Sequence, residues 1–324
     1  MTPSRRELLA IAGTTATMTA VGGWQTVAAQ ETDDLPEYSQ WLTIDDDGLE
    51  FVYVDWANIG DEVITDLEEA EPDEEVPEEY EEDPMVAPAS EGLLEAYFFL
   101  GVDLAQYRLG RLLDAEGDFE STVEGLLRTT DAFVVTGDIQ PEEIDDQLTA
   151  EAEIEFFRQL ERTDEIGEFD VYTPVEGNDA AVAVSTDALV VANGEDDAPE
   201  ATLETLVDAW EGDLEQATEE SESFAWLLET AGDGDVVVGQ YGDRVAATDD
   251  ALVDMAFAEL EDAEGIVSSI TAENEDTASG EFAAIIDGPD EDALGERLGA
   301  SADQRSITIV NDQVVAAGTW REVE

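Results

Sequence analysis

The chain contains no cysteine, no histidine and no lysine, and its only basic residues are eleven arginines. Without cysteine it can form no disulfide, thiolate nucleophile or thiolate metal site. Without histidine it lacks the commonest general base and the commonest metal ligand, so Ser–His and Cys–His catalytic arrangements are excluded. A carboxylate pair, or a cation held by carboxylates, would still suffice for hydrolytic chemistry.

Several motifs that carry chemistry are also missing. There is no G-x-S-x-G nucleophile elbow, no P-loop spacing and no N-x-S/T glycosylation triplet. We therefore assign no catalytic residue, no cofactor-binding residue and no metal ligand from the sequence, and we expect no cofactor.

Acidic residues dominate what is present. The 324 residues include 85 aspartates and glutamates, and the net charge is −74. Such self-repulsion opposes compaction in dilute buffer, but in molar salt the Debye length falls to about 3 Å and the repulsion is screened. Because 43% of the residues are hydrophobic and patterned, we expect a globular protein, and the composition resembles that of haloarchaeal proteins. The charge argues against nucleic acid and anionic membranes as partners, and we expect hydrated cations to bind the surface loosely.

The N-terminal residues have the form of a Tat export signal. Arg5 and Arg6 are followed by a mildly apolar run, Leu8–Val21, which is too short and polar to be a good membrane span. Small residues precede an expected cleavage after Ala29. Cleavage would leave nine basic and 84 acidic residues, a charge of −75. An uncleaved signal that acts as a membrane anchor is the alternative. In both cases we expect an extracellular or cell-surface location. If the signal is cleaved, we expect no stable membrane span in the mature chain.

Composition and periodicity divide the chain into five parts. These are a signal peptide (1–29), a polar lead-in (30–40), a first α+β repeat (41–232) containing an acidic, proline-rich disordered insertion (66–84), and a second, shorter α+β repeat (233–324).

Apolar periodicity predicts the elements within the repeats. A hairpin is expected over Trp41–Trp56, turning at Gly48. Helices are expected at 91–115, from 141 through Leu160, at 203–210, 224–228 and 252–260, and after Pro289. Strands or hairpins are expected at 131–138, 169–174, 180–194, 235–243, 265–274, 280–288 and 306–318.

Two stretches support an internal repeat. Residues 182–193 overlay 307–318 at a constant offset of 125, and residues 132–141 overlay 281–290 at an offset of 149. The aligned pairs include Phe133 with Phe282, Asp138 with Asp287, and Asp187 with Asp312. The predicted fold class is α+β, with two related antiparallel-rich β-sheets that carry helices on one face and pack as one body.

The stretches Val182–Asn193 and Phe224–Asp235 resemble an uncharacterised family of Tat-exported, haloarchaeal-type secreted proteins with a tandem α+β repeat. The resemblance is carried by "VAVSTDALVVAN" and "FAWLLETAGDGD", which are packing and turn motifs. It implies a fold and no activity.

The remaining candidates for chemistry have structural interpretations. Residues 43–54 lack the first and last ligands of an EF-hand loop, and "GDGD" at 232–235 is typical of a turn after a helix. Arg108 and Arg111 are expected to pair with acids rather than to clamp an anion. Stacking on sugars is conceivable for Trp41, Trp56, Trp210, Trp226 and Trp320, but we expect at least three of them in the core.

The favoured function is a non-enzymatic binding or cell-envelope-associated module with an unidentified extracellular partner. The alternative is a secreted hydrolase that uses a carboxylate pair or a carboxylate-bound cation, which would be invisible among so many acids.

Overall fold

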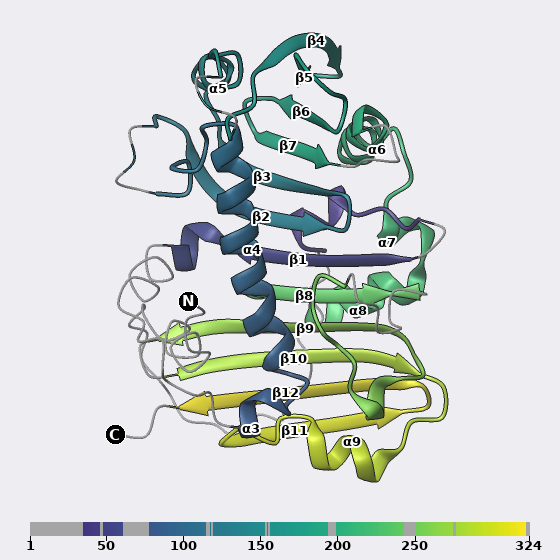
Figure 1. Cartoon of the computed structure of the whole chain (residues 1–324). Helices are drawn as coiled ribbons and strands as arrows, with labels where there is room; N and C mark the ends of the chain where they lie inside the picture. The colour runs from purple at the N-terminus through teal and green to yellow at the C-terminus, as the bar shows by residue number, and fades with distance from the viewer. Residues whose placement is uncertain are drawn as a thin grey trace.

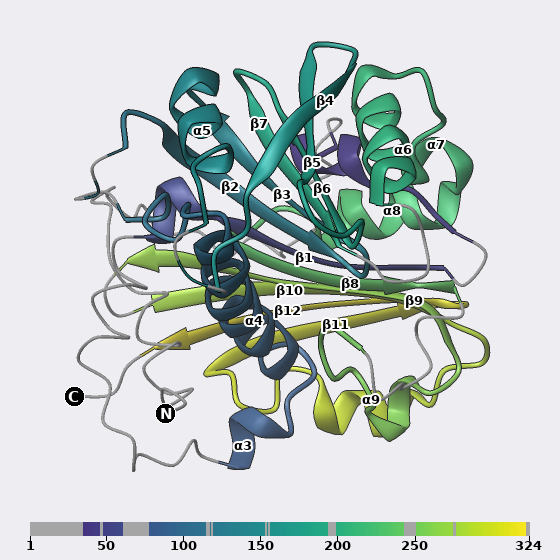
Figure 2. The same cartoon turned by 45° about the horizontal axis from the view of Figure 1, so that its top comes forward.

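The computed structural model describes residues 35–45, 48–60, 78–114, 117, 119–152, 154, 156–193, 199–242, 251–274 and 277–321. Within these residues a single antiparallel sheet of twelve strands runs through the molecule in the order β11-β12-β10-β9-β8-β1-β2-β3-β7-β6-β5-β4 (Figure 1). The strands are β1 (Leu49–Asp55), β2 (Thr122–Thr129), β3 (Ala132–Asp138), β4 (Leu160–Ile166), β5 (Phe169–Pro174), β6 (Ala180–Val184), β7 (Ala188–Asn193), β8 (Val236–Tyr241), β9 (Ala263–Asn274), β10 (Thr277–Ile286), β11 (Gln304–Val310) and β12 (Gln313–Arg321). The sheet twists, so β4–β7 lie steeply across β9–β12 (Figure 2).

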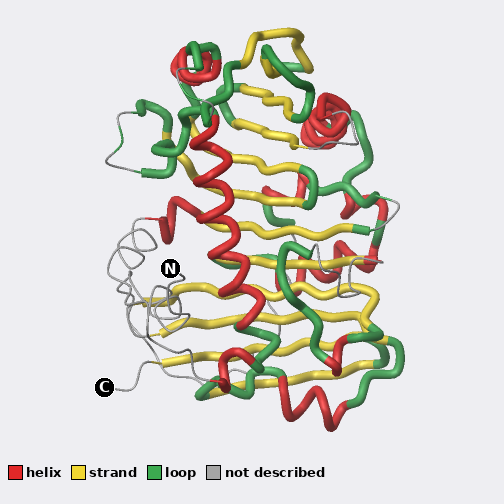
Figure 3. The backbone as a smooth tube through the Cα atoms, viewed as in Figure 1, coloured by secondary structure: helices red, strands yellow, loops and turns green. Residues whose placement is uncertain are grey.

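Helices cover both faces of this sheet. They are η1 (Glu37–Trp41), α3 (Glu78–Glu81), α4 (Ala87–Gln106), α5 (Pro141–Leu148), α6 (Pro199–Glu211), α7 (Ala217–Glu220), α8 (Glu222–Ala231), η3 (Ala258–Leu260) and α9 (Glu291–Arg297). The long helix α4 crosses several strands on one face (Figure 3), together with α5 and α9. The elements η1, α6 and α8 pack on the other face. The expectation of helices on one face is therefore wrong.

Strand β1 shows why both faces need cover. Val52 and Val54 belong to the core under α4, whereas Leu49 and Phe51 belong to the core under α6 and α8. Successive side chains of a strand point to opposite faces, and both rows here are apolar. Strand β1 is therefore covered on both sides.

The two expected sheets are in fact one. Strand β1, which opens the first half, pairs antiparallel with β8, which opens the second, from Leu49↔Tyr241 to Val54↔Val236. This pairing gives each of the two strands a neighbour on both sides, since β2 and β9 occupy their other edges. Backbone groups that would form two exposed edges are thus satisfied inside the sheet.

The strand order is the same when read outward from this central pair. One side runs β1-β2-β3-β7-β6 and the other β8-β9-β10-β12-β11. The registers correspond as well. Phe133 of β3 lies opposite Val191 of β7, and the residues aligned with them at offsets of 149 and 125, Phe282 of β10 and Ala316 of β12, also lie opposite each other. At the two hairpin turns, the carbonyls of Asp187 and Asp312 each accept a hydrogen bond from the neighbouring strand, at 3.1 Å and 2.8 Å. The residues aligned in sequence therefore occupy corresponding positions in the ladders.

Helix α4 ends at Gln106, nine residues earlier than predicted. Arg108 adopts a left-handed backbone with φ 66°. Its N–H donates to the Ala105 carbonyl at 3.1 Å, and the Leu109 N–H donates to the Leu104 carbonyl at 2.8 Å. This is the Schellman arrangement that closes a helix, normally signalled by glycine at the left-handed position. An arginine there gives no such signal, which explains the error.

Other boundaries also differ from the predictions. The helix from Pro141 ends at Leu148, where Thr149 caps it through the Asp145 carbonyl, and Leu160 begins the edge strand β4 instead. Strand β2 was not predicted. The described residues between 251 and 260 form turns and the short η3 rather than an α-helix. The remaining predicted strands, hairpins and helices are present, except that the chain before the Asp45–Gly48 turn forms no strand.

The polar lead-in and the acidic insertion each contain packed residues. Within the polar lead-in, η1 buries Tyr38 and Ser39. Within the insertion at 66–84, residues 78–81 form α3 and Asp83 is completely buried, so the disorder prediction is wrong for residues 78–84. Residues 66–77 lie outside the described residues.

Candidate functional site

A groove lined by aromatic rings and carboxylates lies where η1 and α6 meet β1–β3. We name it the aromatic groove, and its volume is about 530 Å³. Its lining residues are Glu37, Tyr38, Gln40, Trp41, Tyr53, Asp55, Ala57, Glu124, Gly125, Leu127, Thr136, Gly137, Asp187 and Trp210. The lining contains four aromatic rings and four carboxylates, and no arginine.

The rings are fixed by stacking on one another. Tyr38 of η1 stacks on Tyr53 of β1, with ring centroids 4.2 Å apart, and its hydroxyl donates to the Gly232 carbonyl at 2.8 Å. Trp41 stacks on Trp210 of α6 at 5.4 Å. Tyr38 and Trp41 are buried, whereas Tyr53 and Trp210 are partly exposed. The groove therefore offers two partly exposed rings supported by two buried ones.

Two glycines shape the wall of the groove. A Cβ added to Gly125 would lie 2.8 Å from the Thr136 hydroxyl oxygen and 3.1 Å from the Tyr53 ring. Gly137 has φ +151°, and its Cβ would lie 2.0 Å from the Thr122 carbonyl oxygen. A side chain at Gly137 would collide with the backbone of β2, and one at Gly125 would collide with the side chains of Thr136 and Tyr53.

The carboxylates create an acidic environment in the groove. Burial is the main cause that raises the pKa of Asp55, and nearby Asp233 raises it further, although Asp55 accepts a hydrogen bond from the Asn58 backbone N–H at 3.1 Å. Burial, followed by the negative charges of Asp55 and Glu37, raises the pKa of Tyr53 well above its usual value. The Tyr53 hydroxyl therefore stays protonated and can donate a hydrogen bond.

Among the described residues, the carboxylates of Glu50, Asp83 and Asp235 are buried, and each has a structural role. Glu50 accepts from Gln240 Nε2 at 2.8 Å and from the backbone N–H groups of Leu252 and Val253 at 2.9 Å and 3.2 Å. It therefore ties the segment before η3 to the central strands.

Asp235, the last residue of the "GDGD" stretch, accepts from Asn58 Nδ2 and from the Ala272 backbone N–H, both at 2.6 Å. Burial raises its pKa. The stretch itself follows α8 and leads into β8, as predicted.

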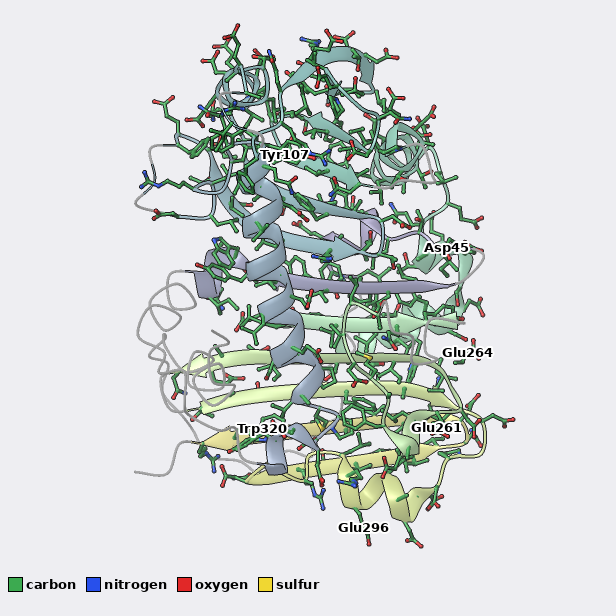
Figure 4. The ribbon with its side chains drawn as sticks, in the orientation of Figure 1. Asp45, Tyr107, Glu261, Glu264, Glu296 and Trp320 are labelled. Carbon is green, nitrogen blue, oxygen red and sulfur yellow. The ribbon has the colours of Figure 1, made fainter. Side chains whose placement is uncertain are left out.

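Asp83 is the third of these acids. It accepts from the backbone N–H groups of Met85, Gly299 and Ser301, and from the Ser301 hydroxyl at 2.6 Å. The same hydroxyl accepts from Nε1 of Trp320, which lies at the β11–β12 end of the sheet (Figure 4). Buried carboxylates with this many donors hold the fold together and are not free for chemistry.

Two further hollows lie near the end of α4, and their volumes are about 350 Å³ and 890 Å³. Both are lined by Arg158 and Asp179, which pair with each other at 2.8 Å. Arg108 donates to the carbonyls of Gln147, Arg158 and Glu151, and among the described residues it has no acidic partner, contrary to the prediction. Arg111 does pair with an acid, Asp114, at 3.4 Å.

The residues singled out from sequence have different outcomes. Arg5, Arg6 and Ala29 lie outside the described residues. Trp41, Trp56 and Trp320 are buried, which confirms that at least three tryptophans serve the core. In the described parts of the chain, no group of three or more acidic side chains is placed to hold a metal ion. No helix among the described residues has the length and apolarity to cross a bilayer.

Sequence reasoning missed most of the groove. Asp55, Glu124 and Asp187 are ordinary members of an acidic population, and Tyr53 was interpreted only as a strand residue. Trp210 was assigned to a helix, as observed. The sequence does name Trp41 and Trp210 as candidates for stacking on sugars, and both line the groove.

Comparisons with known proteins add little to this geometry. No family model matches the sequence, and no curated protein matches it. Among solved structures, crystal forms I and III of TP0453 are similar at a TM-score of 0.43 and 10% identity. The alignments cover 89% and 87% of this chain and 94% and 93% of those chains, respectively. A likeness at this level supports no argument about function.

Proposed function

We propose that this chain is a secreted, salt-adapted, non-enzymatic binding module of the cell envelope, and that it binds a saccharide in the aromatic groove. The observation that carries the proposal is the lining of that groove, in which two partly exposed rings, Tyr53 and Trp210, lie among four carboxylates. Aromatic rings offer apolar contact area, and carboxylates accept charge-assisted hydrogen bonds from hydroxyl groups.

The molar salt that we expect around this chain favours a neutral ligand over a cationic one. In molar salt the Debye length is about 3 Å, so long-range attraction of a cation to the groove is largely screened and inorganic cations compete for the carboxylates. Hydrogen bonds and apolar contacts act at short range and persist. A saccharide presents many hydroxyl donors beside apolar C–H surface, which fits an acceptor-rich groove with aromatic walls.

The export signal belongs to the same proposal. Cleavage after Ala29 would release a mature chain that begins at Gln30. Mass spectrometry of protein recovered from the culture medium should find that terminus, and replacement of Arg5 and Arg6 by lysine should leave the protein in the cytoplasm. Cytoplasmic protein with an intact Met1 as the only form would contradict export.

The internal duplication is also proposed rather than established. Its support is the agreement of two independent sequence offsets with the ladder registers, including the corresponding carbonyl bonds at Asp187 and Asp312. The likeness of Val182–Asn193 and Phe224–Asp235 to secreted tandem-repeat proteins is part of this proposal. Superposition of β6–β7 on β11–β12 with the aligned residues out of register would refute it.

The duplication supplies a matched pair of variants for the binding test. Asp187 and Asp312 are exposed residues at corresponding turns, but only Asp187 lines the groove. Neutral hexasaccharides of glucose and of N-acetylglucosamine are titrated at molar salt by calorimetry. We expect Asp187→Ala to weaken binding at least tenfold and Asp312→Ala to leave it unchanged. No binding by the wild-type chain, or equal losses in both variants, would reject the groove as the site.

One observation supports the hydrolase alternative: Asp55, whose pKa is raised, lies in the groove and could serve as a general acid. Reducing-end release from the same hexasaccharides at high salt measures this activity. Cleavage by the wild-type chain that Asp55→Asn abolishes would replace the binding proposal with an enzymatic one.

A further inference from the structure

Strand β11 forms one edge of the sheet. In the part of the chain that the structure describes, it pairs with β12 alone, in an uninterrupted register from Gln304↔Thr319 to Val310↔Gln313. Most of its residues are exposed, and Val310 is 53% exposed. Alternate N–H and C=O groups of an edge strand point outward, where another strand can pair with them.

The opposite edge, β4, is protected against such pairing. It carries the exposed acids Glu161, Asp164 and Glu165, and its register with β5 shifts between Arg162 and Asp164. Charges and bulges are the usual devices that prevent edge-to-edge association. Strand β11 has neither an acid nor a bulge.

The hairpin that β11 forms with β12 is also low in negative charge. Residues 297–321 contain three arginines and two aspartates, a net charge of +1, in a chain of net charge −74. Residues 160–174, which include β4, contain five acids and one arginine, a net charge of −4. The absence of acid at β11 is thus specific to one edge.

We propose that β11 pairs antiparallel with β11 of a second copy of this chain, around a two-fold axis near Thr308. This contact brings together the two edges that lack acidic residues and keeps the acidic surfaces of both copies apart. Antiparallel pairing also places Arg305 of each copy beside Asn311 and Asp312 of the other. The antiparallel pairing of β1 with β8, from Leu49↔Tyr241 to Val54↔Val236, is an example of such a contact inside one chain.

The lack of native cysteine makes the axis directly testable. Opposed residues of antiparallel strands have Cα atoms about 4.5–5.5 Å apart, within the range that a disulfide spans. A Thr308→Cys variant, oxidised with oxidised glutathione at molar salt, should become a covalent dimer almost completely. Thr163→Cys, at an exposed position of β4, is the matched control and should form no covalent dimer. Equal cross-linking of the two variants would overturn the proposal.

Sedimentation equilibrium at molar salt tests the same contact without cross-linking. The wild-type chain should sediment as a dimer at micromolar concentration. Thr308→Asp places two carboxylates opposite each other and should halve the mass, whereas Thr163→Asp should remain dimeric. Circular dichroism verifies that each variant is folded. A monomeric wild-type chain, or a dimeric Thr308→Asp variant, would refute the proposal.

Discussion

Replacement of Asp83 by alanine should be among the most destabilising single changes in this chain. Its carboxylate, with no exposed surface, joins the start of α4 to residues 299–301. The substitution would leave the buried N–H groups of Met85 and Gly299, and the partly buried N–H of Ser301, without their acceptor. An unsatisfied buried donor costs about 1–3 kcal/mol, so the expected loss is about 3–5 kcal/mol after some relaxation. That loss is a large fraction of a typical stability of about 5–15 kcal/mol.

The measurement is urea denaturation followed by circular dichroism in molar salt, with the free energy of unfolding extrapolated linearly. Glu81→Ala is the control, because it removes an exposed carboxylate two residues away and should change the midpoint little. Asp83→Asn keeps the shape but turns an amide N–H₂ toward N–H donors, so it should also destabilise strongly.

A double-mutant cycle then assigns the effect. Ser301→Ala removes the hydroxyl that donates to Asp83 and accepts from Trp320. Residues in one network should be non-additive by about 0.5–3 kcal/mol. A loss below about 1 kcal/mol for Asp83→Ala, or strict additivity with Ser301→Ala, would refute the reasoning.

Three further predictions follow from the packing and the charge. Gly239→Ala should destabilise the fold by about 1–3 kcal/mol, because the new methyl group would lie 2.3 Å from the buried Phe51 ring. The control is Gly295→Ala, whose methyl group would meet nothing within 4 Å and which should be neutral or stabilising. The midpoints of urea denaturation test both variants. Burial raises the pKa values of Asp55 and Asp235 above the ordinary aspartate value of 3.8. The folded state therefore binds a proton at each carboxyl group more tightly than the unfolded state does. The stability that the two protonated carboxyl groups contribute is full below about pH 4 and is lost as the pH rises through the raised pKa values. Between about pH 4 and 7, the free energy of unfolding should therefore fall less steeply with pH in Asp55→Asn than in the wild-type chain. An unchanged slope would contradict the raised pKa of Asp55. Dialysis from molar to about 0.1 M salt should abolish the circular dichroism signal of the fold, because self-repulsion is no longer screened, and a retained spectrum would show that salt is dispensable.

The sequence by itself determined the elements whose signals are local. Strands β6 and β7 are continuous apolar runs with a two-residue turn at Thr186–Asp187, and α9 follows the N-cap Asp290. Even the correspondence of the two hairpins was readable, because apolar alternation and turn residues repeat at a constant offset.

Tertiary structure decided the rest, because the deciding contacts are distant in sequence. Strand β2 is half polar, and it forms a strand because β1 and β3 lie on either side of it. The pairing of β1 with β8 merged two expected sheets into one, since two unpaired edges would leave backbone groups unsatisfied. Asp83 is buried in an acidic segment because donors from residues 299–301 meet it there. The aromatic groove likewise gathers Tyr53, Asp187 and Trp210 from three separate elements, and composition alone could not select these carboxylates and rings from so many.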